Sequence, residues 1–181
     1  MKNKSLIVTV FVLVAVIALA AAVYPSLAEN AVEATTAEQT SIADTVQYKK
    51  YTDIRIFDKN GNEVKLSDFE GRPMILNFWA TWCGYCIYEM PDFEEAFKEH
   101  GDEIQFLMVN TDDGIGIGED FIETEGYTFP TYYDLQFNAA VTYGISGIPR
   151  TIAIDAEGNI RYNRSGMIGS DTLQSIIDMI K

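Results

Sequence analysis

The amino-acid sequence predicts an α/β domain in which helices cover both faces of a central mixed β-sheet. Residues 73–78 and 104–109 are short, almost continuously apolar runs, as is typical of strands buried on both faces of a sheet. Between them, residues 86–100 carry apolar side chains at helical spacing, so the three segments form a β-α-β unit. Two weakly alternating segments, 54–57 and 63–65, add an N-terminal β-hairpin extension.

Local signals indicate where these elements end and how the chain continues. Asn60-Gly61 is a strong turn signal for the N-terminal hairpin, and Gly101 is expected to end the first long helix. Residues 114–118 contain three glycines but lack the spacing of a nucleotide-binding loop, because Glu119 stands where the third glycine of that motif belongs. We therefore expect a flexible loop at this position.

The second half of the chain predicts two short helices, a second hairpin and a closing helix. The short helices are expected at 118–125 and 138–143. Residues 150–154 alternate, and 160–163 follow a turn as their hairpin partner. Ser170 is expected to cap the closing helix, whose single apolar stripe is formed by Leu173, Ile176, Ile177 and Ile180.

The first 28 residues are expected to lie outside the folded domain. Their apolar run, residues 6–23, is 18 residues long, which exceeds the ~7–15 residues of a signal-peptide core and falls within the ~17–25 of a spanning helix. Lys2 and Lys4 would hold the N-terminus in the cytoplasm. The length favours an uncleaved signal anchor over a signal peptide cut near Ala28. Either interpretation places the rest of the chain on the extracytoplasmic side.

Composition separates the remainder into a tether and a domain. Residues 29–47 are rich in Ala, Thr, Glu and Ser and are expected to be flexible, whereas residues 48–181 are expected to fold. The chain carries 27 acidic and 13 basic residues, a net charge of −14, which argues against binding to nucleic acid or to an anionic lipid surface. One acidic run is interpreted as a solvated face, with recognition of a basic partner left open: Asp92, Glu94, Glu95, Glu99, Asp102 and Glu103.

The only two cysteines, Cys83 and Cys86, stand between a buried strand and a helix. A disulfide framework and a complete Cys/His zinc site are therefore excluded, and haem attachment is excluded because Ile87 follows the second cysteine where histidine is required. At a helix start, the pair can close a disulfide across the first turn. Free N–H groups there favour the Cys83 thiolate, the attacking species in disulfide exchange.

Two other uses of the cysteine pair stay open at this point. A purely structural disulfide would contribute only ~2 kcal/mol, because the loop it closes is so small. A metal site would have to recruit His100 and carboxylates as additional ligands.

The surroundings of the cysteines resemble a known family. Residues 76–86 (LNFWATWCGYC), the following Glu89-Met90-Pro91 and residues 144–151 (GISGIPRT) resemble the TlpA-like, membrane-anchored thiol–disulfide oxidoreductases of the thioredoxin superfamily, which include the cytochrome c maturation reductases. The resemblance covers about residues 50–181. It implies a thioredoxin-like fold and a redox-active cysteine pair.

The same resemblance implies how a substrate is held. Pro149 would be preceded by a cis peptide bond and would face the cysteine pair, and Ile148 would present its backbone to an extended substrate strand. Trp82 and Tyr85 are expected to form an apolar, substrate-contacting rim around the pair, in which Trp79 either takes part or belongs to the core.

The sequence departs from cytoplasmic thioredoxins at one important position. Asn77 stands where those proteins carry a buried aspartate, and an amide cannot move a proton. TlpA-like reductases share this Asn and place a Glu three residues past the second cysteine, which makes Glu89 the candidate for moving the proton at Cys86. The alternative is that Glu89 is only a first-turn acid favoured by the helix dipole.

Together these observations predict an extracytoplasmic protein disulfide reductase that acts on exported proteins, such as apocytochrome c, through the Cys83–Cys86 dithiol. No cation follows Cys86, which favours a reducing pair. No cofactor or metal is expected, so a membrane thiol carrier would have to supply electrons. Two alternatives stay open: a disulfide oxidant or isomerase with the same fold, and a non-catalytic binding module.

Overall fold

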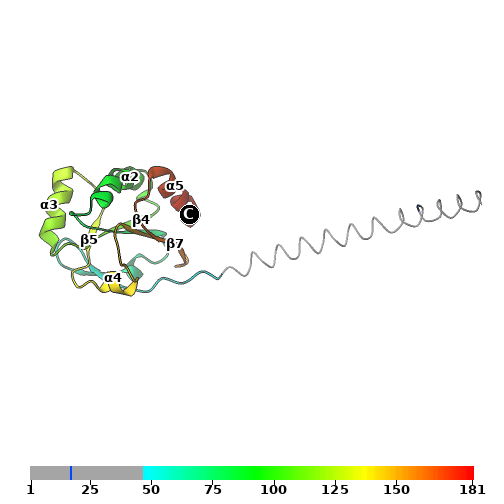
Figure 1. Ribbon diagram of the computed structural model, residues 1–181. Helices are drawn as coiled ribbons and strands as arrows, with labels where there is room; N and C mark the ends of the chain where they lie inside the picture. Colours follow the sequence, from blue (N-terminus) through cyan, green and yellow to red (C-terminus); the bar gives the residue numbers. More distant parts are fainter. Residues whose placement is uncertain (1–16, 18–46) are drawn as a thin grey trace, which may run out of the picture. The chain divides into compact units, whose positions relative to one another are not determined.

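One seven-stranded mixed sheet organises the part of the chain that the computed structural model describes, which is residue 17 and residues 47–181. Its strand order is β2-β1-β5-β4-β3-β6-β7 (Figure 1). The three central strands are parallel: β3 (Met74–Trp79), β4 (Gln105–Asn110) and β5 (Thr131–Tyr133). The outer strands pair antiparallel. On the side of β3 the sheet continues with β6 (Arg150–Ile154) and then β7 (Ile160–Ser165). On the side of β5 it continues with β1 (Arg55–Phe57) and then β2 (Glu63–Lys65). The predicted mixed sheet and N-terminal hairpin are confirmed.

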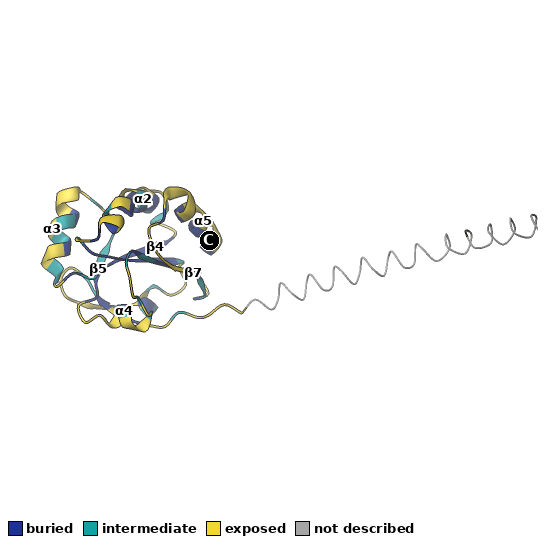
Figure 2. Cartoon of the chain, in the orientation of Figure 1, coloured by how far each residue is buried: buried dark blue, intermediate teal, exposed yellow. Residues whose placement is uncertain are grey.

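Helices cover both faces of this sheet, as the sequence predicts (Figure 1). One face is covered by α2 (Gly84–His100), α3 (Ile115–Glu125) and α5 (Ser170–Ile180). The opposite face is covered by α4 (Asn138–Thr142) and the 3-10 helix η1 (Leu66–Phe69). Each helix turns its buried side towards the strands and its exposed side outwards (Figure 2). The buried apolar side chains form two clusters, one on each side of the sheet.

The β-α-β unit places the cysteine loop at the carboxyl end of the central strands. In the parallel ladder between β3 and β4, Trp79 pairs with Asn110 at the last position of both strands. The chain leaving β3 enters the loop to Cys83, and the chain leaving β4 continues into Thr111 and Asp112. Because parallel strands end at the same edge of a sheet, these two loops meet.

Several local expectations are wrong in detail. Residues 115–118 are not a loop, because α3 begins at Ile115 and buries Ile122 against the sheet. Gly118 fits there because a side chain would collide with Tyr133: a Cβ would lie 2.9 Å from that ring. Apolar burial and close packing therefore override the low helix propensity of glycine.

One other difference concerns the start of a helix, and two concern short elements that were not predicted. Ser170 is the first residue of α5 and does not cap it, because the N-cap is Gly169. The sequence analysis missed β5, a strand of only three residues directly after Pro130, and η1, a single short turn. Such short elements carry too few residues for a periodic pattern.

The structure does not test the predictions for the N-terminal segment. The signal anchor or signal peptide at 1–28 and the tether at 29–47 lie outside the described residues, apart from residues 17 and 47. Within the described part of the chain, none of the helices combines the length and apolar character needed to cross a membrane.

Candidate active site

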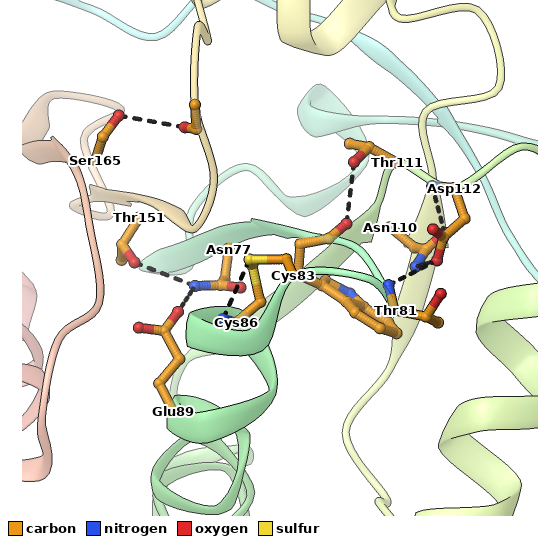
Figure 3. Close-up of a disulfide and its surroundings, with 12 residues drawn as sticks. Asn77, Thr81, Cys83, Cys86, Glu89, Asn110, Thr111, Asp112, Thr151 and Ser165 are labelled. Atoms are coloured by element: carbon orange, nitrogen blue, oxygen red, sulfur yellow. Dashed lines mark hydrogen bonds between the residues drawn. A yellow bond between two sulfur atoms is a disulfide. The ribbon is translucent and has the colours of Figure 1, made fainter.

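Cys83 and Cys86 form a disulfide across the first turn of α2 (Figure 3). Cys83 is the N-cap residue, and its sulfur accepts a hydrogen bond from the Cys86 N–H at 3.2 Å. The Cys83 N–H in turn donates to the Ala80 carbonyl at 3.1 Å. Cys83 is 8% exposed and Cys86 1%, so the two sulfurs occupy unequal environments. The predicted disulfide is confirmed.

Glu89 lies one helical turn beyond Cys86 and is buried. Its two oxygens accept hydrogen bonds from the Asn77 side-chain amide at 2.8 Å and from the Ile168 N–H at 2.8 Å. Burial raises the pKa of Glu89 from 4.5 to about 7, against the opposing effect of these two donors, and the charge of Asp92 adds a smaller upward effect. The interpretation of Glu89 as a first-turn acid is wrong, because the first turn of α2 contains no acid.

Asn77 links Glu89 to the neighbouring strand (Figure 3). Its amide also donates to the Thr151 hydroxyl at 3.2 Å, so a buried polar chain runs from β6 through β3 to α2. The sequence analysis identified Asn77 and Glu89 but not Thr151 or the Ile168 N–H. No local signal could have found the Ile168 contact, since it joins residues 79 apart in the sequence.

The peptide bond between Ile148 and Pro149 is cis, as the family resemblance implies. In the antiparallel ladder between β3 and β6, Arg150 pairs with Phe78, which places Pro149 beside the carboxyl end of β3 and the start of the cysteine loop. Ile148 packs against the apolar cluster that contains both cysteines. The Pro149 carbonyl accepts the Gly166 N–H at 2.9 Å, so the loop after β7 is fixed to this segment.

Two of the three aromatic residues expected around the cysteine pair are exposed, and one further exposed aromatic residue was not predicted. Trp82 and Tyr85 are 73% and 71% exposed, whereas Trp79 is fully buried and belongs to the core. Tyr88 is 76% exposed, and its spacing of three residues from Tyr85 places it on the same face of α2. The three-residue spacing from Tyr85 was the sequence signal that could have identified Tyr88.

A second polar cluster lies on the other side of the disulfide (Figure 3). The Asp112 carboxylate accepts the Thr81 N–H and the Asn110 side-chain amide, both at 2.9 Å. Thr111 donates to the Trp79 carbonyl through its N–H at 2.9 Å and its hydroxyl at 3.1 Å. The sequence analysis missed this cluster, although three polar residues directly after a buried strand were a usable signal.

The described residues contain no group of His, Cys, Asp and Glu side chains arranged to hold a metal ion. The groups at this site that can take part in redox and proton-transfer chemistry are the two sulfurs and the buried carboxyl group of Glu89, one helical turn beyond Cys86.

A disulfide at the start of a helix, together with a cis-proline directly before the antiparallel strand that pairs with β3, defines a thioredoxin-fold thiol–disulfide oxidoreductase. The family model of the AhpC/TSA family matches residues 47–163, and the chain belongs to this family. The predicted resemblance to TlpA-like oxidoreductases is confirmed by relatives that carry this activity in their names.

The chain is similar to the thiol–disulfide oxidoreductase ResA of Geobacillus kaustophilus, with 34% identity over 132 residues, which cover 71% of this chain and 75% of that protein. It also resembles two solved structures. A candidate thiol–disulfide oxidoreductase from Bacteroides vulgatus is 30% identical, with a TM-score of 0.68 and coverage of 75% of this chain and 97% of that one. StoA from Bacillus subtilis is 25% identical, with a TM-score of 0.61 and coverage of 70% and 96%.

Proposed function

We propose that this thiol–disulfide oxidoreductase reduces disulfides in exported proteins through the dithiol form of Cys83 and Cys86. The Cys83 thiolate attacks one sulfur of the target disulfide, and the other target sulfur leaves and takes up a proton. Cys86 then attacks Cys83 in the mixed disulfide, which frees the second target sulfur. Two electrons and two protons pass to the target, and the Cys83–Cys86 disulfide is left behind.

The unequal environment of the two sulfurs carries this assignment. Cys83 caps the helix, is 8% exposed and accepts the Cys86 N–H, a contact that favours a thiolate at Cys83. Cys86 is 1% exposed, so a target sulfur reaches it less easily. Cys83 is thus the attacking thiol and Cys86 the resolving thiol.

Glu89 acts on the proton of Cys86 in this proposal. Its pKa of about 7 keeps both protonation states populated near neutral pH, so the carboxylate can take the Cys86 proton and return it, directly or through one water. No Lys, Arg or His occurs between Arg72 and Lys98. Without such a cation the thiolates are less stabilised, and the pair is more reducing.

The substrate contacts are proposed from the surroundings of the sulfurs. Ile148 and Pro149 lie at the carboxyl end of β3 and would hold an extended target strand, with the Ile148 backbone as its partner. Trp82 and Tyr85 are more than two-thirds exposed and would cover the apolar parts of the target.

The place of action is proposed from the N-terminal sequence. The apolar run 6–23 would anchor the chain in the cytoplasmic membrane, and residues 29–47 would carry the domain on the extracytoplasmic side. A membrane thiol carrier would then return two electrons to the Cys83–Cys86 disulfide. Apocytochrome c before haem attachment is one target compatible with this arrangement.

The reduction potential of the Cys83–Cys86 couple, measured by equilibration with glutathione, tests the proposed direction. We expect a value near the ~−270 mV of thioredoxin or below it. A value between ~−120 and −180 mV, the range of strong oxidants and isomerases, would overturn the reductant role and support the alternative function.

A further inference from the structure

The outward face of α2 carries a continuous stripe that begins beside the disulfide. Its members recur at intervals of three or four residues, which places them along one side of the helix: Tyr85, Tyr88, Asp92, Glu95 and Glu99. Tyr85 and Tyr88 are 71% and 76% exposed, and Glu95 and Glu99 are also exposed. The stripe is therefore aromatic at the disulfide end and acidic along the rest of the helix.

A groove lies along the acidic part of this stripe. It has a volume of about 300 Å³ and runs between α2 and α5. No basic residue lines the groove, whereas four acidic residues do: Asp92, Glu95, Glu99 and Asp171. Lys98, the one Lys or Arg in α2, pairs with Glu94 at 3.0 Å. Glu99 Oε1 lies 3.8 Å from His100 Nε2, and no Lys or Arg lines the groove.

We propose that the stripe and groove bind an extended, basic segment of the target polypeptide next to the cysteine under attack. This inference rests on the proposed reductase function and specifies its substrate class. Tyr85 and Tyr88 can hold Lys or Arg side chains by cation–π contact, and the groove carboxylates attract the following positive charges. The net charge of the chain, −14, strengthens the attraction at longer range.

The length of the stripe fits a short peptide segment. Tyr85 and Glu99 are 14 positions apart in α2, which corresponds to about 21 Å along the helix axis. An extended strand of about six or seven residues covers that distance. A target whose basic residues follow its cysteine within this span would contact the aromatic part and the acidic part together.

The test compares two synthetic peptides that are closed by one disulfide and differ only in the flanking run, which is lysine in one and glutamate in the other. The reduced full-length protein transfers two electrons and two protons to either peptide and is left with the Cys83–Cys86 disulfide. We expect kcat/KM to be about tenfold higher for the lysine peptide at low salt, and the preference to shrink as salt screens the charges.

The variant Glu95→Gln/Glu99→Gln should lower kcat/KM for the lysine peptide about three- to tenfold. Glu123→Gln/Glu125→Gln on α3 makes the same charge change at exposed residues away from the groove and should have a much smaller effect. Tyr88→Ala should raise KM for the lysine peptide several-fold and leave kcat almost unchanged. The inference is overturned if both charge variants act equally or if the peptides react at equal rates.

A small neutral disulfide, 2-hydroxyethyl disulfide, separates this inference from the proposed function. It is too small to reach the groove, so both charge variants should reduce it at the wild-type rate. If the wild type reduces the neutral disulfide but shows no preference between the peptides, only the docking surface is wrong. If the wild type reduces none of the three, the reductase function itself fails.

Discussion

The Asp112 carboxylate accepts the N–H of Thr81 at 2.9 Å and so ties the end of β4 to the loop that carries Cys83 (Figure 3). Thr111 holds the carbonyl of Trp79, the last residue of β3 and two residues before Thr81. In the oxidised protein, the disulfide also fixes Cys83 to α2. After reduction this covalent link is lost, and we expect the contacts of Asp112 and Thr111 to keep positioning Cys83.

Replacement of Asp112 by alanine should therefore weaken the reduced protein. The Thr81 N–H and the Asn110 amide lose their acceptor in a buried site, and we expect the free energy of unfolding to fall by about 1–3 kcal/mol. Urea denaturation of the reduced protein measures this change. Asp112→Asn keeps one acceptor oxygen and should lose less than half as much. Equal losses in both variants would mean that the carboxylate charge, and not its hydrogen bonds, holds the loop.

The sequence predicted the central strands, the long helix and the cysteine pair because each depends on local signals. Strands β3 and β4 are apolar runs, and α2 has helical periodicity over many residues. The CxxC spacing between Cys83 and Cys86 needs no tertiary contact to be recognised. Sequence analysis therefore found the core of the fold and the reacting atoms.

The environment of those atoms depends on contacts between distant residues and was not predictable in the same way. Glu89 was identified by its position, but its burial and its pKa depend on Asn77 and on the Ile168 N–H from the loop before α5. The glycine at position 118 of α3 fits closely against Tyr133, which leaves no room for a side chain. Neither interaction leaves a periodic or local trace in the sequence.

The variant Glu89→Gln should slow disulfide exchange about 10- to 100-fold, because an amide cannot carry the proton of Cys86. The wild-type rate should change with pH around pH 7, where Glu89 titrates, and the variant should lose that step. The measurement is the rate of insulin reduction between pH 6 and pH 9. The exposed Glu123→Gln serves as the control. A variant profile identical to that of the wild type would remove Glu89 from the mechanism.

Glu89 should also make folding stability depend on pH. Burial raises its pKa from 4.5 to about 7, so between these values the native state binds more protons than the unfolded state. Protonation of Glu89 therefore adds to the free energy of unfolding. This addition is complete below about pH 4.5 and is lost as pH rises through 7, a change of about 3 kcal/mol. We expect the stability difference between wild type and Glu89→Gln to fall by this amount from pH 4.5 to 7.5. A constant or rising difference in urea titrations would contradict the raised pKa.

The proposed anchor at 6–23 predicts how the full-length protein behaves in membrane fractions. An 18-residue apolar run that spans the bilayer should resist extraction by alkaline carbonate, which removes proteins bound only by surface charge. Mass spectrometry of the retained protein should show an intact N-terminus. Release of a shorter form that begins near Glu29 would show cleavage instead, and the domain would then act as a secreted protein.

The two cysteines should behave differently when each is replaced by serine. Cys86→Ser keeps the proposed attacking thiol, Cys83, at the helix N-cap but lacks the proposed resolving thiol, so a covalent complex with the target should accumulate. Cys83→Ser leaves only the buried Cys86 and should reduce insulin no faster than the uncatalysed reaction. Non-reducing electrophoresis with a disulfide-containing protein target detects the complex, and the double serine variant is the control.

If Cys83→Ser trapped the target instead, the attacking and resolving roles would have to be exchanged. If neither variant trapped it and the wild type were equally inert, the domain would be a binding module.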